Sequence, residues 1–224
     1  MKNEDTGKYA KDEVLRPSIL TAEEQAALTP DMVLEILKQG NQEFTNGELT
    51  IRNNPQRIKD SSIGQYPKAA IISCLDSRVP VEDVFHRGIG DIFVGRIAGN
   101  FVNEDLLGSL EFACKLAGAK LIVVLGHENC GAINSAIDNV KLGNLTSMLS
   151  KIRPAVEVAE NGFSGEKTSK NLTFVHKVCV ENVRLAINFI RIKSPILKEM
   201  EYKNEIKIVG GIYHLSSGRV DFIE

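Results

Sequence analysis

Short apolar runs rich in β-branched residues recur along the chain and predict strands. The runs at 69–73 and 121–125, AAIIS and LIVVL, are almost continuously apolar, as expected for strands buried on both faces of a sheet. Further strands are expected at 92–96, 206–213 and 220–223. The last two are joined by HLSSGR, which contains Gly218 and predicts a hairpin.

Segments with apolar residues three and four positions apart predict helices. Thr29 and Pro30 begin one helix, as N-cap and first-turn proline, and Asn46-Gly47 ends it. Others are expected at 80–85, from Asn103 to about Gly118, from Asn129 to about Val140, from about Thr146, and at 169–192. This alternation predicts an α/β fold: a mostly parallel central sheet of about four strands plus an antiparallel edge strand, flanked by helices.

Two stretches do not follow these periods. Residues 1–28 are charged, weakly periodic and interrupted by Pro17, so we expect an N-terminal arm that is either extended or laid across a partner subunit. Residues 29–224 are expected to form one domain. The polar stretch 48–67 is expected to be an irregular connection.

Composition and charge narrow the functional classes. The chain has 224 residues, of which 43% are apolar and 25% charged, which is ordinary for a globular protein. A net charge of −2, scattered basic residues and the absence of Trp argue against a nucleic-acid partner. No stretch reaches the roughly 20 apolar residues of a membrane span. The first twenty residues lack the apolar core of a signal peptide, so a cytoplasmic location is expected, with a periplasmic one as the alternative if a signal peptide has been removed.

Two short strings carry the candidate chemistry: SCLDSRVP at 73–80 and LGHENCGA at 125–132. Each follows a predicted strand, and ligands bind beyond the carboxyl ends of strands in open parallel sheets. Cys74, His127 and Cys130 therefore form a three-ligand set for Zn²⁺. Structural zinc usually takes four protein ligands, so three indicate a catalytic metal with an open fourth position. The other cysteines, Cys114 and Cys179, lie in helical patterns and are expected to be small buried hydrophobes.

Asp76 and Arg78 lie beside the first predicted ligand. Asp76 could accept a hydrogen bond from bound water or occupy the fourth metal position, and Arg78 could hold it away by a bidentate ion pair. We hypothesise that this competition forms a pH-sensitive switch; the alternative is a purely structural ion pair. His86, His176 and His214 are expected to be surface or satisfied core histidines.

These motifs resemble those of the β-class carbonic anhydrases. The family motif Cys-x-Asp-x-Arg is matched at 74–78, His-x-x-Cys-Gly at 127–131, and the segment ending in Arg-x-Ala-Gly-Asn at 90–100. Order and spacing match from about residue 30 to 223. Ile97 is a departure, because many members have Asn there.

The resemblance implies a carbonic anhydrase, a zinc lyase that reversibly hydrates carbon dioxide to bicarbonate and a proton by means of zinc-bound hydroxide. It implies zinc held by Cys74, His127 and Cys130, with Asp76 and Arg78 as the catalytic pair. By family analogy, a backbone N–H near Gly99 would hold a substrate oxygen, and Val79 and Phe101 would line the path of CO₂. The resemblance also implies a homodimer, often paired into a homotetramer, with the N-terminal helices embracing the partner.

Three other functions remain open at this stage. A hydrolase of CS₂ or COS on the same fold would share the zinc ligands. A non-enzymatic zinc-binding protein would use Asp76 as a permanent fourth ligand. A cysteine phosphatase is disfavoured, because its loop would place Arg six residues after Cys rather than four and would contain phosphate-binding glycines.

Overall fold

A five-stranded sheet forms the centre of the molecule. The computed structural model describes residues 19–48 and 54–223. The strands lie in the order β2-β1-β3-β4-β5, with bounds β1 Ala69–Ser73, β2 Ile92–Arg96, β3 Leu121–His127, β4 Lys207–Tyr213 and β5 Val220–Ile223. The first four are parallel and β5 is antiparallel to β4. The predicted sheet, including its antiparallel edge, is confirmed.

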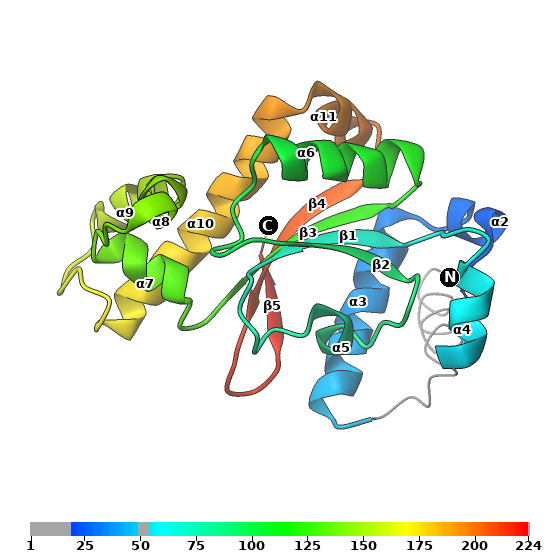
Figure 1. Cartoon of the computed structure of the whole chain (residues 1–224), viewed down its shortest axis with the longest axis horizontal. Helices are drawn as coiled ribbons and strands as arrows, with labels where there is room; N and C mark the ends of the chain where they lie inside the picture. The colour runs from blue at the N-terminus through cyan, green and yellow to red at the C-terminus, as the bar shows by residue number, and fades with distance from the viewer. Residues whose placement is uncertain (1–18, 49–53, 224) are drawn as a thin grey trace, which may run out of the picture.

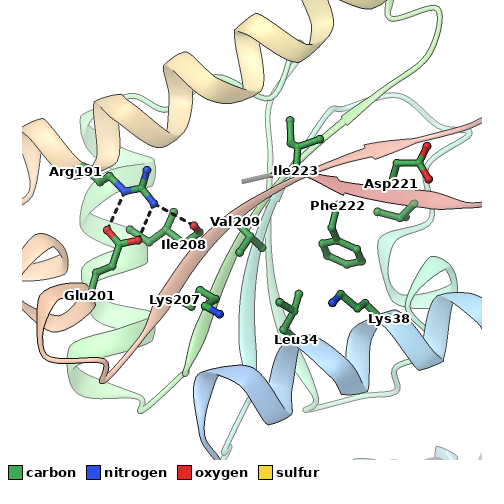
Figure 2. Close-up of a pocket in the computed structure, with 11 residues that line it drawn as sticks. Leu34, Lys38, Arg191, Glu201, Lys207, Ile208, Val209, Asp221, Phe222 and Ile223 are labelled. Carbon is green, nitrogen blue, oxygen red and sulfur yellow. Dashed lines mark hydrogen bonds and ion pairs between the residues drawn. The ribbon is translucent and has the colours of Figure 1, made fainter.

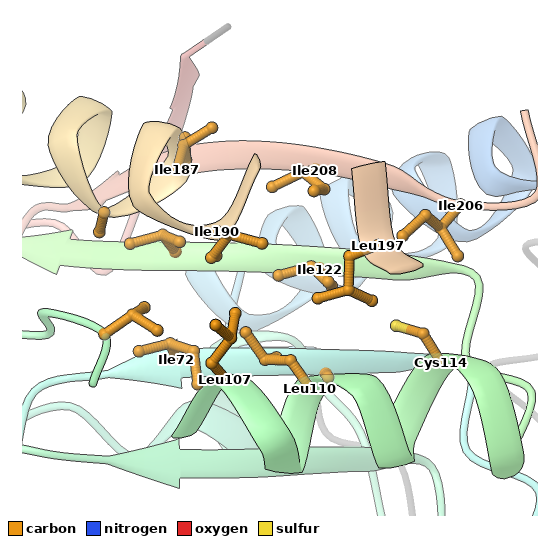
Figure 3. Packing of buried hydrophobic residues seen from close by; sticks show 14 of the residues in the cluster. Ile72, Leu107, Leu110, Cys114, Ile122, Ile187, Ile190, Leu197, Ile206 and Ile208 are labelled. Carbon is orange, nitrogen blue, oxygen red and sulfur yellow. The ribbon is translucent and has the colours of Figure 1, made fainter. Parts of the chain in front are cut away.

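Helices cover both faces of this sheet (Figure 1). Alternate strand residues such as Ile71 and Val123 pack against α3 (Pro30–Thr45) and α5 (Val81–Val84). Their neighbours Ile72 and Ile122 face the other way, toward α6 (Glu104–Glu111), α10 (Leu172–Lys193) and α11 (Pro195–Tyr202), as Figure 3 shows. Because side chains alternate across a strand, each buried strand serves two apolar layers.

A third apolar cluster lies at the carboxyl ends of β1 and β3. It joins Cys74, Phe101 and Cys130 to the inner sides of three short helices and to the N-terminal half of α10. The short helices are α7 (Gly131–Ile137), α8 (Gly143–Leu149) and α9 (Arg153–Glu160). This cluster therefore places a packed apolar lobe next to the predicted metal ligands.

Several predicted helix ends are confirmed by their caps. The side chains of Thr29 and Asn103 each accept a hydrogen bond from a first-turn amide of α3 and α6 respectively. The helix expected at 169–192 is α10, which begins at Leu172 after the N-cap Asn171. The helix begun at Asn103 changes to a π-helix over Phe112–Leu116 before Gly118 ends it in the left-handed region. The helix expected from about Thr146 is two helices, α8 and α9.

The prediction of an irregular connection at 48–67 was wrong, because α4 (Asn54–Ser61) lies within it. Its mean hydropathy is low, so its sequence contains no apolar periodicity from which a helix could be predicted. Arg57, its buried residue, forms an ion pair with Asp91 at 2.7 Å. Helix α11 was also not predicted; Ser194 caps it and Pro195 occupies its first turn. Helix α4 thus depends on a distant contact, whereas α11 has local start signals that hydrophobic periodicity does not include.

Part of the expected N-terminal arm is described. Residues 22–26 form α2 (Ala22–Ala26), capped by Thr21. From α2 the buried Gln25 donates hydrogen bonds to the carbonyls of Pro67 at 2.7 Å and Ala117 at 2.8 Å. This end of the arm is thus attached to its own chain. Residues 1–18 lie outside the described residues, and the boundary of the arm at residue 28 stays a prediction.

Across residues 19–48 and 54–223, no helix combines the length and the apolar character needed to cross a bilayer.

Candidate metal centre

The two motifs found in the sequence meet at one edge of the sheet. Cys74 directly follows β1, and His127 is the last residue of the adjacent strand β3. Cys130 is the N-cap residue of α7. One ligand atom from each of the three residues lies within 4.8 Å of the other two, and all three residues are buried. The predicted ligand trio is therefore brought together.

The geometry of this trio fits a tetrahedral divalent cation such as zinc. The sulfurs of Cys74 and Cys130 are 3.8 Å apart. Two sulfurs bound tetrahedrally to one zinc ion at about 2.3 Å would themselves be about 3.8 Å apart. The two sulfurs are thus spaced as two vertices of one coordination tetrahedron require.

The histidine presents the correct nitrogen. His127 Nδ1 lies 2.8 Å from the carbonyl oxygen of Glu128, so Nδ1 carries the proton and donates it there. Nε2 is then an unprotonated acceptor. It is buried and has no hydrogen-bond partner among the described residues. Burial without a partner is costly for such an atom, and a metal bond removes that cost.

The two thiols are electrostatically coupled. The hydrogen bond from Cys130 is the largest cause; together with the one from the Gly99 N–H it outweighs burial and lowers the pKa of Cys74 to about 4. The pKa of the Cys130 thiol is raised, because its proton is shared with the Cys74 thiolate and because it is buried. The pair thus holds one proton, which a cation would displace on binding both sulfurs.

Asp76 is held by Arg78 in a bidentate ion pair. Arg78 Nε and Nη2 donate to Asp76 Oδ1 and Oδ2 at 2.9 and 2.7 Å, and the Arg78 backbone N–H also donates to Oδ1 at 2.9 Å. These bonds from Arg78 lower the pKa of Asp76 to about 2. Asp76 Oδ2 lies 3.8 Å from His127 Nε2. The carboxylate is therefore beside the metal position, ionised, and bound by Arg78.

Arg96 is a site residue that sequence reasoning missed. At the end of β2, its Nε donates to the carbonyl of Cys74 at 3.0 Å and its Nη2 to the carbonyl of Asp76 at 2.6 Å. It thereby fixes the backbone of the loop that carries the first motif. The sequence signal that could have identified Arg96 was its position, since it is a charged residue at the end of the strand that neighbours β1.

The residues predicted to contact substrate lie in different surroundings. The Gly99 N–H donates to Cys74 Sγ at 3.3 Å. Phe101 packs in the same cluster as Cys74 and Cys130. Val79 is fully buried in the cluster against α3 and α5, which contains neither cysteine. The roles of all three toward substrate stay predictions, and the surroundings favour Phe101 over Val79.

Two of the remaining histidines have acidic partners distant in sequence. His86 Nδ1 lies 3.0 Å from Glu43 Oε2, and both side chains are buried. His214 lies between Glu128 and Asp221, with its Nδ1 at 2.7 Å and its Nε2 at 2.9 Å from their carboxylates. Glu43 and Glu128 are 43 and 86 residues away from their histidines, so ligand spacing could not reveal them. The third, His176, is exposed.

A cavity of about 740 Å³ lies away from this centre, over β4 and β5 (Figure 2). Its charges are paired: Arg191 makes a bidentate ion pair with Glu201 at 2.8 Å and donates to the Ile208 carbonyl at 3.3 Å. Its floor is apolar, with Leu34 and Phe222 among the lining residues. It includes none of the predicted site residues.

Comparison with known proteins gives one consistent family. Residues 69–220 match the family model described as carbonic anhydrase. The chain is 34% identical over 195 residues to carbonic anhydrase 2 of Mycobacterium tuberculosis, covering 85% of this chain and 91% of that protein. It is 32% identical over 194 residues to a carbonic anhydrase of Mycolicibacterium smegmatis, covering 86% of this chain and 92% of that protein.

Solved structures agree with this. The β-carbonic anhydrase CafA of Aspergillus fumigatus superposes with a TM-score of 0.67 at 26% identity, covering 76% of this chain and 81% of that chain. The β-carbonic anhydrase CcaA, at 22% identity, shares the fold with a TM-score of 0.68, covering 85% of this chain and 95% of that chain. The matched residues include both motifs of the metal centre. The chain therefore belongs to the β-carbonic anhydrase family, whose activity is the reversible hydration of carbon dioxide.

Proposed function

We propose that the resident metal is zinc, bound by Cys74, His127 and Cys130, and that this centre hydrates carbon dioxide to bicarbonate. The observation that supports this most directly is the buried His127 Nε2 without a protein partner, facing two sulfurs that are 3.8 Å apart. Thiolate and imidazole are ligands that zinc favours. When bound in such a site, zinc lowers the pKa of water and so supplies a nucleophile near neutral pH.

The protein residues around this centre would orient the reactants. Because Arg78 keeps Asp76 ionised, the carboxylate is available as a hydrogen-bond acceptor and can orient the hydroxyl group that attacks CO₂. Arg78 occupies both carboxylate oxygens, which favours an Asp76 that assists catalysis over one that acts as a permanent metal ligand. The Gly99 N–H is directed at Cys74 Sγ, so we assign it to the thiolate rather than to substrate.

Stopped-flow measurement of CO₂ hydration, with the zinc content of the same sample, tests the proposal. We expect about one zinc ion per chain, loss of hydration after removal of zinc by a chelator, and recovery when zinc is added back. Full hydration activity in protein free of zinc would overturn it. Turnover of CS₂ or COS without hydration of CO₂ would instead assign the site to the related hydrolases.

We further propose that the chain assembles as a homodimer or a dimer of dimers. Leu75, next to the ligand Cys74, is 66% exposed, an apolar side chain at the rim of the site. The two related β-carbonic anhydrases of Sordaria macrospora are tetrameric. Sedimentation equilibrium is expected to give a mass of two or four chains, and Leu75→Asp is expected to weaken the assembly. A monomeric wild type at micromolar concentration would contradict this.

A further inference from the structure

Helix α10 packs along β3 and β4 (Figure 1), and two of its polar side chains donate to backbone carbonyls close to the metal ligands. Cys179 and Asn182, which are three residues apart, lie on the same buried side of this helix. Cys179 Sγ donates to the carbonyl of His127 at 3.4 Å. Asn182 Nδ2 donates to the carbonyl of Gly99 at 2.8 Å. Since much of the buried side of α10 is apolar, an amide placed there has to have a specific partner.

The partner of Asn182 is a position of the chain that requires glycine. Gly99 has φ +81°, in the left-handed region, and a Cβ added to it would lie 2.4 Å from Ile152 Cδ1. It lies beyond the end of β2, so no strand pairing holds it. Its N–H donates to Cys74 Sγ at 3.3 Å. The orientation of this residue therefore decides whether Cys74 Sγ accepts the Gly99 N–H hydrogen bond.

The neighbouring side chain does not hold this loop. Both polar atoms of Asn100 are buried without a hydrogen-bond partner among the described residues. The Asn100 backbone N–H donates to the Ile97 carbonyl, which closes a turn that does not use the Gly99 carbonyl. Within the described part of the chain, the Gly99 carbonyl accepts its hydrogen bond from the Asn182 side chain.

We propose that Asn182 is a positioning residue of the metal centre: by binding the Gly99 carbonyl, it keeps the Gly99 N–H directed at Cys74 Sγ. This inference rests on the metal site proposed above. A thiolate that accepts an N–H hydrogen bond donates less charge to its metal, so Asn182 acts on the metal through two linked hydrogen bonds. Asn182 contacts neither metal nor substrate in this role.

Asn182→Leu tests the proposal, because leucine has similar volume and no donor. The wild type and the variant are loaded with Co²⁺, which replaces zinc and reports thiolate ligation through its sulfur-to-metal charge-transfer band. Zinc affinity is measured by competition with a chelator, and the melting temperature is recorded alongside. We expect the variant to fold, its charge-transfer band to move to longer wavelength, and its zinc affinity to fall by about 10- to 100-fold.

Ile187→Ala is the matched control. Ile187 lies on α10, is buried against the sheet (Figure 3) and has no contact with Gly99 among those described. We expect this variant to lower the melting temperature while leaving the cobalt band and the zinc affinity as in the wild type. If Ile187→Ala shifts the cobalt band and lowers the zinc affinity as much as Asn182→Leu does, the proposal is overturned, since both changes would then reflect general loosening of α10.

The outcomes separate this inference from the function on which it rests. A wild type that binds zinc and hydrates CO₂, with an Asn182→Leu variant of unchanged band and affinity, overturns the role of Asn182 alone. A wild type that binds no zinc overturns both. If Asn182→Leu does not fold, Asn182→Ala removes the same donor without adding volume, and the same two readouts apply.

Discussion

His127 keeps Nε2 unprotonated and available to a metal beside the two sulfurs, because its Nδ1–H donates to the carbonyl of the next residue, Glu128. Hydrogen bonds between nearby residues also set the protonation state of Asp76. Arg78 keeps Asp76 ionised, with a pKa of about 2, so a move of Asp76 between Arg78 and the metal near neutral pH would not involve its own protonation. At the scale of single residues, the site is thus built from hydrogen bonds that choose one protonation state for each group.

Asp76→Asn is expected to retain zinc and to lose most activity. The amide has the shape of the carboxylate but not its charge, so it is a poorer acceptor for the attacking hydroxyl group, and hydration should fall about 100-fold or more. Zinc content and stopped-flow rates measure the two effects. Asp31→Asn, at the opposite end of the sheet beside Lys207, is the control and should keep full activity. Full activity in Asp76→Asn would remove Asp76 from the mechanism.

Cys130→Ala is expected to abolish zinc binding, whereas Cys114→Ala should preserve it. Both cysteines are buried and free, but only Cys130 belongs to the ligand trio. Because binding energy at such a site contributes to folding, a chelator should lower the melting temperature of the wild type and of Cys114→Ala, but not that of Cys130→Ala. Equal zinc content in all three proteins would contradict the ligand assignment.

At the scale of elements, close approach of backbones explains a glycine inside a helix. Gly40 lies within α3, where alanine normally stabilises. A Cβ at Gly40 would be 2.0 Å from the carbonyl oxygen of Phe85, the residue that ends α5. The absence of a side chain thus lets α3 pack directly on the α5 backbone.

Gly40→Ala should therefore destabilise the protein, by about 1 to 3 kcal/mol or more, since backbone has to move to admit the methyl group. Gly108→Ala is the matched comparison, because Gly108 lies in α6 with no atom within 4 Å of its added Cβ. That variant should be more stable by roughly 0.5–1 kcal/mol. Chemical denaturation measures both, and a stabilised Gly40→Ala would contradict the packing described.

Much at this scale could be predicted from the sequence, because strands, caps and the ligand trio are encoded locally. Continuous apolar runs located β1 and β3, and strand ends located Cys74 and His127. The remainder depends on residues far apart in the chain. Arg57 stabilises α4 through Asp91, and Arg96 holds the Cys74 carbonyl from another strand. No local period or spacing encodes such contacts.

At the scale of the whole molecule, a buried ionic cluster lies at the sheet edge opposite the metal centre. Asp91, just before β2, pairs with Lys68 at 3.0 Å and with Arg57 at 2.7 Å. Burial alone would raise the pKa of Asp91, but the charges of Lys68 and Arg57 outweigh it and lower the pKa below its ordinary 3.8. The ion pair between Lys68 and Asp91 thus links the amino ends of β1 and β2, whereas the ligand trio lies at the carboxyl ends.

Asp91→Asn should cost about 3–5 kcal/mol of folding free energy near neutral pH, because it removes the carboxylate from buried cations. The lowered pKa means that the ionised carboxylate stabilises the fold above about pH 4. That stability is lost as the pH falls from there through the lower pKa of the folded state. The difference between wild type and variant should therefore shrink on acidification. Denaturation across this range measures it, and a constant difference would contradict the assignment.

The inclusion of His127 in β3 has a thermodynamic consequence. A cation bound to a strand residue and to the chain segments that continue β1 and β3 would cross-link the centre of the sheet rather than a peripheral loop. Its release should then be coupled to global opening, so amides of β1 and β3 should exchange with solvent more slowly in the metal-loaded protein. The α8 and α9 lobe, which supplies no ligand, should show the smaller change.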